Sequence, residues 1–340
     1  MSAPDITVRP YRPGDEDGIL RLFNEVFAED DPAHALRSRA HWEWEFLENP
    51  AGTQVVLGVE PNGRIIAQYA CLPAIVHLAG RRVCCGQGID SVVHKDYRRG
   101  LKREGAFLKT AKYYFEHYGV PEVNAFGYGF PNKKAYRIGV RMLGYVPIAT
   151  PVKTLARNLI NFKNDAEASE GGDPAGSVVP IDRFDERSDR LWGAIEAKHA
   201  MAIVRDARYL NWRYVDCPSV EHESFGLEDG AGGWRATWTL RRNWMGPPIL
   251  AVCELIADPK DVGAIARALA HVCRYAREHG QQRVEIWVPP TTPVYDTILA
   301  RGFKAESSPF NLCVKIYDPA LDAAWARANW YYTIGDSDVF

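Results

Sequence analysis

The amino-acid sequence predicts an α/β protein with mixed sheets, built from two similar halves in tandem. The block HWEWEFLENP at 41–50 reappears in altered form as YLNWRYVDCP at 209–218. Both blocks place a Trp, an aromatic residue two positions later, and a Pro four positions after that. Each block precedes short strands, a long amphipathic helix, a further strand and a short helix that ends in Gly-aromatic. Self-similarity over this length predicts a duplicated structural unit.

The two long helices are the clearest individual elements. Apolar side chains recur with the 3.6-residue helical period over 107–118 and over 262–276. A strand is expected after each helix, at 122–126 and at 283–288. A strand, a helix and a second strand in this order predict a βαβ unit in a largely buried sheet.

Composition narrows the function classes. The 340 residues carry a net charge of −2, so no broad basic surface is expected and no nucleic-acid partner is predicted. No apolar run approaches the roughly 18 residues of a spanning helix, and the N-terminus has no secretory pattern. Seven cysteines without CxxC and nine histidines without HxxxH or HxH spacing predict free thiols and no metal site. We expect a soluble cytoplasmic protein with no membrane partner.

The chain is expected to divide into a cofactor-binding domain at 1–155, a linker at 156–179, a second domain at 180–318 and a tail at 319–340. The stretch 161–179 is polar and rich in Gly, which predicts an exposed connector or, alternatively, a lid over the site. The last eleven residues, WYYTIGDSDVF, are aromatic and acidic. A disordered tail rarely holds so many aromatics, so docking near the active site is expected.

The segment RRGLKREG at 98–105 is the strongest candidate for a ligand site. It places two glycines and four cations where a strand leads into the first long helix. Helix N-termini present unpaired N–H groups to anions, and glycine permits close approach, so the segment predicts a pyrophosphate cradle. A solvated basic loop is the alternative. The equivalent stretch LIADPKDVG at 255–263 has two aspartates and no arginine and would repel an anion. The cofactor is therefore assigned to the first half.

These motifs resemble the GNAT superfamily of acyltransferases. VVHKDYRRG at 92–100 is similar to its acyl-CoA loop, and ITVRPYRPGDEDGILRLFNEVF at 6–27 to its opening strand and helix. GYGFPNKKAYRIGVRMLGY at 127–145 resembles its late strand, Asn-bearing turn, helix and closing Gly-aromatic. GFPN followed by Gly-aromatic is typical of the tandem-GNAT branch that includes the enhanced-intracellular-survival acetyltransferases, although this chain lacks room for their extra C-terminal domain. The likeness covers 1–150 strongly and 180–318 weakly, so the second domain is expected to be a degenerate GNAT-like copy.

The resemblance implies acetyl-CoA, or another acyl-CoA, as co-substrate, with no metal and direct transfer to an amine. A backbone N–H near Val92 or Val93 would polarise the thioester carbonyl, and Asn132 would bind the pantetheine arm. The superfamily's turn is Arg-x-x-Gly-x-Gly or Ala, whereas Lys102 and Glu104 occupy its glycine positions here. The expected cofactor-binding residues are Val92, Val93, Arg98, Arg99, Gly100, Lys102, Arg103, Gly105, Ala106 and Asn132.

Three residues are candidates for proton transfer. Asp90 is the first choice as base, because it lies on the strand just before the polarising amides. Tyr136 is the candidate acid for the leaving thiolate. In the survival-type relatives the terminal carboxylate reaches the active site, which makes Phe340 a rival base. The alternatives are a backbone-bound Asp90 and a Tyr136 that only packs.

Four further carboxylates are candidates for binding a cationic acceptor. Glu29 and Asp30 follow the first helix, where GNAT proteins have a substrate loop, and a solvated acidic turn is the alternative. Asp336 and Asp338 belong to the tail. All four would attract a positively charged amine.

The leading functional prediction is acetyl-CoA-dependent N-acetyl transfer to a primary amine of a small molecule, such as an amino sugar or an antibiotic-like amine. Fem-type transfer from aminoacyl-tRNA is a second enzymatic hypothesis, and a non-catalytic acyl-CoA sensor or scaffold is a third. The sequence leaves a homo-oligomer open.

Overall fold

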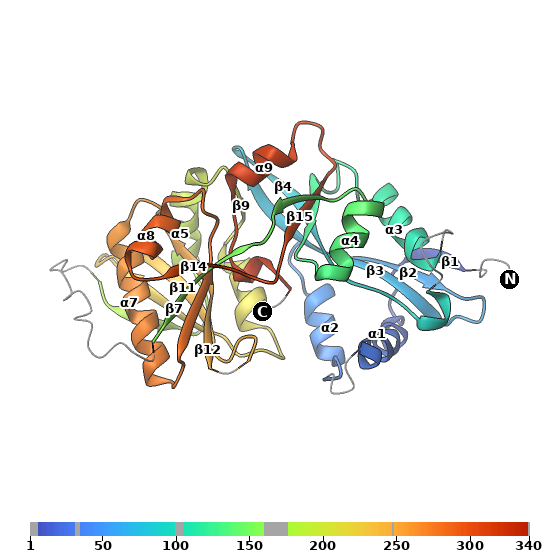
Figure 1. The fold of residues 1–340 in the computed structure, drawn as a ribbon, viewed down its shortest axis with the longest axis horizontal. Coiled ribbons are helices and arrows are strands. Elements are labelled where there is room, and N and C mark those ends of the chain that lie inside the picture. The colour runs from blue at the N-terminus through green and yellow to red at the C-terminus, as the bar shows by residue number, and fades with distance from the viewer. Residues whose placement is uncertain (1–5, 31–34, 99–104, 160–175, 247, 339–340) are drawn as a thin grey trace.

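Two twisted mixed sheets stand side by side, each with its own helices (Figure 1). This computed structural model describes residues 6–30, 35–98, 105–159, 176–246 and 248–338. Helices α1 to α4 accompany the first sheet, and α5, α7 and α8 accompany the second. Among the described residues, no helix is both long and apolar enough to cross a membrane.

The first sheet is antiparallel along most of its width. Its strand order is β1-β2-β3-β4-β5-β15-β6, and only the β4–β5 pair in this path is parallel. Its bounds are β1 Thr7–Pro10, β2 Gln54–Val59, β3 Ile65–Leu78, β4 Arg81–Val93, β5 Phe126–Gly129, β15 Leu312–Ile316 and β6 Val146–Ala149. Two short strands extend it beyond β3, namely β9 Met201–Ile203 and β16 Trp330–Tyr331.

The second sheet repeats this plan. Its order is β14-β7-β13-β12-β11-β10-β8, again with one parallel pair, β12–β13. Its bounds are β14 Lys304–Ser307, β7 Lys153–Asn158, β13 Arg283–Trp287, β12 Ile249–Ala257, β11 Trp234–Arg241, β10 Glu223–Glu228 and β8 Val178–Ile181.

The two sheets exchange one strand each. Strand β7 follows β6 in the chain but lies between β13 and β14 of the second sheet. Strand β15 follows β14 but lies between β5 and β6 of the first. A boundary at 155 therefore cuts through β7, and a unit at 180–318 includes a strand of the other sheet. Most of the expected connector, 160–175, lies outside the described residues.

The helices begin where the sequence supplies a cap. Asn132 caps α4, Asp185 caps α5 and Asp261 caps α7 through their side-chain oxygens. Both predicted long helices are present, as α3 and α7. The bounds are α1 Glu16–Asp30, α2 Arg39–Phe46, α3 Ala106–His117, α4 Lys133–Met142, α5 Glu186–Ile195, α6 Ala207–Leu210, α7 Val262–Glu278, α8 Pro293–Ala300 and α9 Ala323–Asn329.

One expected strand is shifted along the chain. Residues 122–125 form a turn rather than the start of a strand, and β5 begins only at Phe126. The buried Asn124 explains the shift, because its amide donates to the Tyr118 carbonyl at 2.8 Å and to Gln54 Oε1 at 3.0 Å. Such side-chain bonds favour a turn over a sheet ladder. The other expected strand, at 283–288, matches β13.

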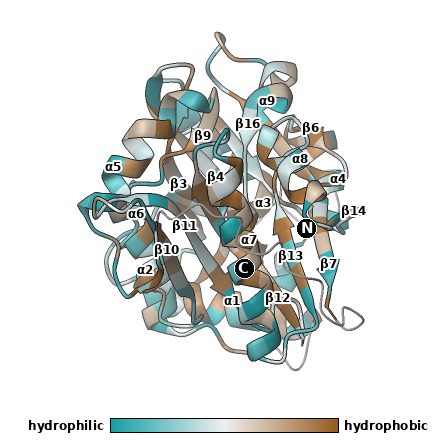
Figure 2. Ribbon diagram, turned by 90° about the vertical axis from the view of Figure 1, so that its left-hand side faces the viewer, coloured by the Kyte–Doolittle hydropathy of each residue, from teal (hydrophilic) through white to brown (hydrophobic). Residues whose placement is uncertain are grey.

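A continuous apolar core joins the two sheets. The largest cluster of buried side chains includes β5, β12, β13, β15 and the C-terminal segment. Hydropathic colouring shows apolar strands running through the interior behind more polar helices and loops (Figure 2). The aromatic residues Phe126 and Tyr128 of β5 pack edge to face on Trp330 of the tail. The tail is therefore part of the fold.

Candidate active site

The central strands of the first sheet separate to leave an opening. Strand β4 pairs with β5 only where Cys85, Gly86 and Gln87 face Phe126, Gly127 and Tyr128. Beyond these pairs β4 continues to Val93 without β5 as a neighbour. A cavity of about 430 Å³ lies at this divergence. Its walls come from α1, β4, α3, β5 and α4, and Asp338 of the tail contributes to them.

A bulge in β4 shapes the opening. The register with β3 shifts between Gln68 and Ala70, so that Asp90 and Ser91 together face Tyr69. Asp90 has a φ of +46°, a left-handed conformation that aspartate adopts more readily than most residues. The Gln68 amide donates to the Asp90 carbonyl at 3.0 Å and holds the bulge. Bulges bend a strand and redirect its side chains, and this one turns Asp90 toward the cavity.

The backbone of β4 directs one N–H group into the opening. In an antiparallel ladder the residues along a strand alternate between bonding their neighbour and facing away. The His94 N–H bonds the Ile66 carbonyl of β3 at 2.9 Å. Val93, one position earlier, therefore points its N–H away from β3. Arg98 Nε donates to the Val93 carbonyl at 2.8 Å from the same side, which agrees with this direction. Of the two valines, Val93 has the better orientation for polarising a carbonyl.

The N-termini of helices α3 and α7 differ in whether an acidic side chain caps them. Helix α3 follows Gly105, and no described side chain caps it, so none of these side chains competes with an anion for its first N–H groups. Helix α7 is capped by Asp261, whose carboxylate accepts from the Ala264 N–H at 2.9 Å and pairs with Arg235 at 2.7 Å. An anion could therefore bind at α3, whereas the protein's own carboxylate already occupies the N-terminus of α7.

Part of the predicted cofactor loop lies outside the described residues, namely Arg99, Gly100, Lys102 and Arg103. On either side of it, Gly105 and Ala106 begin α3, and Arg98 lines the cavity. The Arg98 guanidinium forms an ion pair with Glu29 at 3.0 Å. Asp30 is the last residue of α1. Glu29 thus binds a cofactor-loop cation in this structure.

Helix α4 forms the other wall. The Asn132 Oδ1 atom caps the helix by accepting from the N–H groups of Lys134 and Ala135 at 3.1 and 3.0 Å. Its amide N–H donors have no partner among the described residues, so capping leaves them available to a ligand. Tyr136 is half-buried and faces the cavity with Ile138. No residue of α4 is fully buried, although its apolar face points inward, as expected for a wall that a ligand covers.

An ion cluster that the sequence did not reveal lies beside Asp90. Arg37 binds the Asp90 carboxylate and also Glu45 Oε2, the latter at 2.8 Å. Burial raises the pKa of Glu45 to about 8 and raises the pKa of Asp90, with Arg37 opposing both shifts. Glu45 lies in the repeat block at 41–50, which was the only sequence signal for this position.

The tail brings one of its two aspartates to the cavity. Asp338 lines the cavity, and burial among protein atoms, together with the nearby Asp90, raises its pKa to about 6. Asp336 is 1% exposed and instead forms an ion pair with Arg205 at 2.8 Å. Phe340 lies outside the described residues.

The cavity thus brings together seven of the predicted site residues from four separate segments. They are Asp90, Val92, Val93, Arg98, Asn132, Tyr136 and Asp338. No group of His, Cys, Asp and Glu side chains among the described residues has the arrangement of a metal site.

Comparison with known proteins identifies this fold. Residues 7–118 match the family model described as an acetyltransferase (GNAT) domain. A conserved protein from Enterococcus faecalis V583, described as a probable N-acyltransferase, has a TM-score of 0.65 at 11% identity, over 92% of this chain and 73% of its own. A GCN5-related N-acetyltransferase from Kribbella flavida has a TM-score of 0.63 at 16% identity, over 92% and 72%. No curated protein matches the sequence.

A third solved structure, of a long-chain acyltransferase, also shares the architecture. The N-myristoyltransferase of Saccharomyces cerevisiae, solved with myristoyl-CoA, has a TM-score of 0.57 at 13% identity, over 93% of this chain and 79% of its own. The solved structures show that this chain shares the fold of these acyltransferases. Within it, the first part of the chain matches the GNAT acetyltransferase domain model.

Proposed function

We propose that this protein transfers an acetyl group from acetyl-CoA to a primary amine of a small molecule, such as an amino sugar or an antibiotic-like amine. One observation carries the proposal. The cavity between β4 and β5 combines an inward-facing N–H at Val93 with carboxylates at Asp90 and Asp338. An acyl-transfer site needs both a donor for the thioester oxygen and an acceptor for the amine proton.

The acyl-CoA would bind along the first sheet only. The uncapped start of α3 and the adjacent cations suit the pyrophosphate, and the cavity suits the pantetheine arm. Asn132 has free amide donors for it, and the apolar face of α4 would cover it. Asp261 makes the N-terminus of α7 unsuitable for a second molecule. We therefore expect one acyl-CoA per chain.

The reaction forms a C–N bond and breaks the C–S bond of the thioester. The amine must lose a proton, and the departing thiolate must gain one. Tyr136 faces the cavity and is the proposed donor to the thiolate.

Two carboxylates compete for the role of base. Asp90 is bound to Arg37, which stabilises its ionised form and occupies one of its oxygens. Asp338 faces the cavity, and its pKa near 6 leaves it ionised at neutral pH while keeping it basic enough to accept a proton. We favour Asp338, or the terminal carboxylate of Phe340 two residues later, as base and Asp90 as a binding group.

The acceptor is proposed to be cationic because two carboxylates, Asp90 and Asp338, line the same cavity. Burial and the nearby Asp90 raise the pKa of Asp338, and a bound ammonium would relieve the repulsion between these two carboxylates. A tandem-GNAT arrangement like that of the survival-type acetyltransferases fits the matching strand orders of the two sheets. The proposed partner is this small amine, with no nucleic acid and no membrane.

The test pairs calorimetry with a thiol-release assay. Titration with acetyl-CoA should show one site per chain. Free CoA should then appear only when glucosamine, an aminoglycoside or a simple diamine is added. Binding without release for any amine would favour an acyl-CoA sensor. Absence of binding would overturn the proposal and leave the aminoacyl-tRNA hypothesis, which a charged-tRNA transfer assay would examine.

A further inference from the structure

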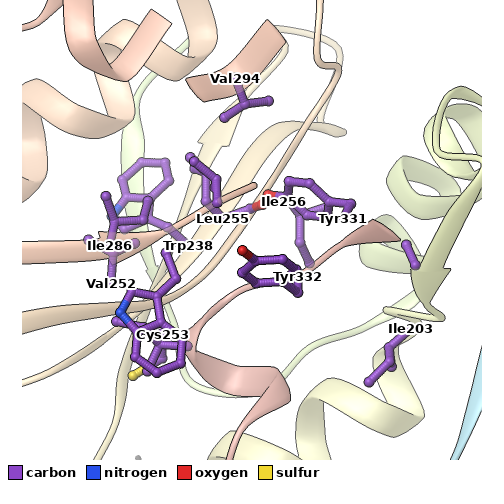
Figure 3. Close-up of a cluster of buried hydrophobic side chains, with 14 of the residues drawn as sticks. Ile203, Trp238, Val252, Cys253, Leu255, Ile256, Ile286, Val294, Tyr331 and Tyr332 are labelled. Atoms are coloured by element: carbon purple, nitrogen blue, oxygen red, sulfur yellow. Dashed lines mark hydrogen bonds between the residues drawn. The ribbon is translucent and has the colours of Figure 1, made fainter. Parts of the chain in front are cut away.

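The second sheet has an opening of the same kind as the first, but the chain's own tail fills it. Strand β12 pairs with β13 only from Ile249 to Val252 and then continues to Ala257. Figure 3 shows Tyr331 and Tyr332 among side chains of β12 and α8. Where the first sheet has a cavity, the second has a buried peptide.

The two tyrosines anchor the tail in the opening. The Tyr331 hydroxyl donates to the Leu255 carbonyl of β12 at 2.7 Å. Tyr331 and Tyr332 are 3% and 4% exposed, so the opening excludes water around both rings. Leu255 lies beyond the last residue of β12 that pairs with β13. The tail therefore binds the part of β12 that corresponds to the cavity-facing part of β4.

Gly335 lets the tail lie directly on β12. A Cβ atom at this position would come within 1.9 Å of the Tyr214 hydroxyl and 2.9 Å of the Cys253 carbonyl. Its φ is not in the left-handed region, so close approach, rather than backbone conformation, requires glycine here. The segment that carries Gly335 therefore packs against β12 and Tyr214 without room for a side chain at this position.

Two buried arginines of the second half hold the segment that follows. Arg205 is fully buried and joins Asp336 of the tail at 2.8 Å to Glu254 of β12 at 3.0 Å. Arg213 donates to the Gly335 carbonyl at 3.0 Å and to the Ser337 carbonyl at 2.5 Å. These contacts fix the backbone on both sides of Asp336. The next residue, Asp338, enters the cavity of the first sheet.

We propose that the opening between β12 and β13 is an intramolecular receptor for residues 330–337, and that this docking positions Asp338 in the active site of the first sheet. Gly335 and Arg213 are then positioning residues. The receptor itself is a property of the fold, whereas the catalytic consequence rests on the function proposed above. The second half thus contributes to catalysis by binding the tail instead of a second acyl-CoA.

The test uses a substitution that changes no charge. Gly335→Ala should displace the tail from β12, and Gly193→Ala is its control, because a Cβ at Gly193 meets no atom within 4 Å. Hydrogen exchange of the peptide 330–338 reports docking without any substrate. We expect Gly335→Ala to accelerate that exchange at least tenfold and to lower kcat by about 10²-fold, as misplacement of a catalytic group does. The KM for acetyl-CoA should stay within about twofold, because the α3 site is untouched.

Arg213→Lys and Arg213→Met form a second pair. Lysine retains the charge and an N–H donor group, so the kcat of Arg213→Lys should be higher than that of Arg213→Met. This pair also tests the proposal if Gly335→Ala does not fold. Faster exchange at 330–338 with unchanged kcat would overturn the positioning role. Wild-type exchange at 330–338 as fast as in an unstructured peptide would overturn the receptor itself. If the wild-type protein released no CoA with any amine, the function would fail while the exchange results would still decide whether the tail docks.

Discussion

Trp44 and Trp212 exchange hydrogen bonds with each other's backbone. The Trp44 indole N–H donates to the Trp212 carbonyl at 2.6 Å, and the Trp212 indole N–H donates to the Trp44 carbonyl at 2.9 Å. Their rings stack at 5.5 Å. These are the equivalent tryptophans of the two repeat blocks. The two blocks therefore contact each other, through the same position in each. Reciprocal contact between equivalent positions is the pattern that an approximate two-fold axis produces.

Replacing Trp212 with Phe should destabilise the protein through this exchange. The substitution leaves the buried Trp44 carbonyl without its donor, so the free energy of unfolding should fall by about 1–3 kcal/mol beyond the loss of ring volume. Trp238→Phe is the matched control, because Trp238 is also buried and its indole N–H has no hydrogen-bond partner among the described residues. Urea denaturation would measure both. Equal losses in the two variants would mean that the exchanged bonds contribute nothing net.

The repeat and the long helices could be predicted because their signals are local. Periodic apolar residues define α3 and α7, and the blocks around Trp44 and Trp212 are visible without any structure. The aspartates of LIADPKDVG predicted that this stretch would repel an anion, and the structure shows that one of them, Asp261, caps α7. A helix terminus and its cap lie within a few residues of each other, so the sequence contains the whole interaction.

Long-range pairings could not be predicted in this way. Strands β7 and β15 look like ordinary strands of their own halves, and only the three-dimensional structure shows that they are exchanged. Arg37 and Asp90 are 53 positions apart, and Arg205 and Asp336 are 131 apart. The aromatic composition of the tail predicted docking but could not identify β12 as its receptor.

Asp338→Asn should remove one limb of the pH–rate profile. The pKa of Asp338 is raised to about 6, so as base it is active when ionised, and kcat/KM should rise with pH through about 6 and then level off. The amide cannot accept the proton, so kcat should fall by roughly 10²–10⁴-fold and the pH 6 limb should disappear. Asp17→Asn, at an exposed position on α1, is the control. Retention of the limb in Asp338→Asn would transfer the role of base to Asp90 or to the terminal carboxylate.

Tyr136→Phe tests the proposed thiolate donor. Tyr136 is half-buried on α4, so loss of its hydroxyl should leave the melting temperature nearly unchanged. We expect kcat to fall by about 10²-fold with little change in the KM for acetyl-CoA, since the hydroxyl would act on the leaving group. Tyr113→Phe, at a half-buried position of α3 that does not line the cavity, should leave both constants unaltered. A normal kcat in Tyr136→Phe would assign this residue to packing alone.

Glu45→Gln should make stability less dependent on pH. The pKa of Glu45 is about 8 in the folded protein, above the 4.5 of an unperturbed glutamate. Between these values the folded state binds more protons than the unfolded state, so the free energy of unfolding falls as pH rises. His41 has the opposite effect, because its pKa of about 4 makes stability rise with pH until about 6.5.

Comparing the variant with the wild type from pH 6.5 to 8 therefore reports on the carboxylate, because the histidines are common to both proteins. Across it the glutamine variant should gain about 1.5 kcal/mol of stability relative to the wild type, since a neutral amide loses no proton on unfolding. Glu43→Gln, at a half-buried position on the same helix, controls for the loss of one negative charge. A stability difference between Glu45→Gln and wild type that stays constant with pH would show that Arg37 keeps Glu45 ionised throughout. The cluster beside Asp90 would then hold a full negative charge at neutral pH, which would strengthen its attraction for a cationic acceptor.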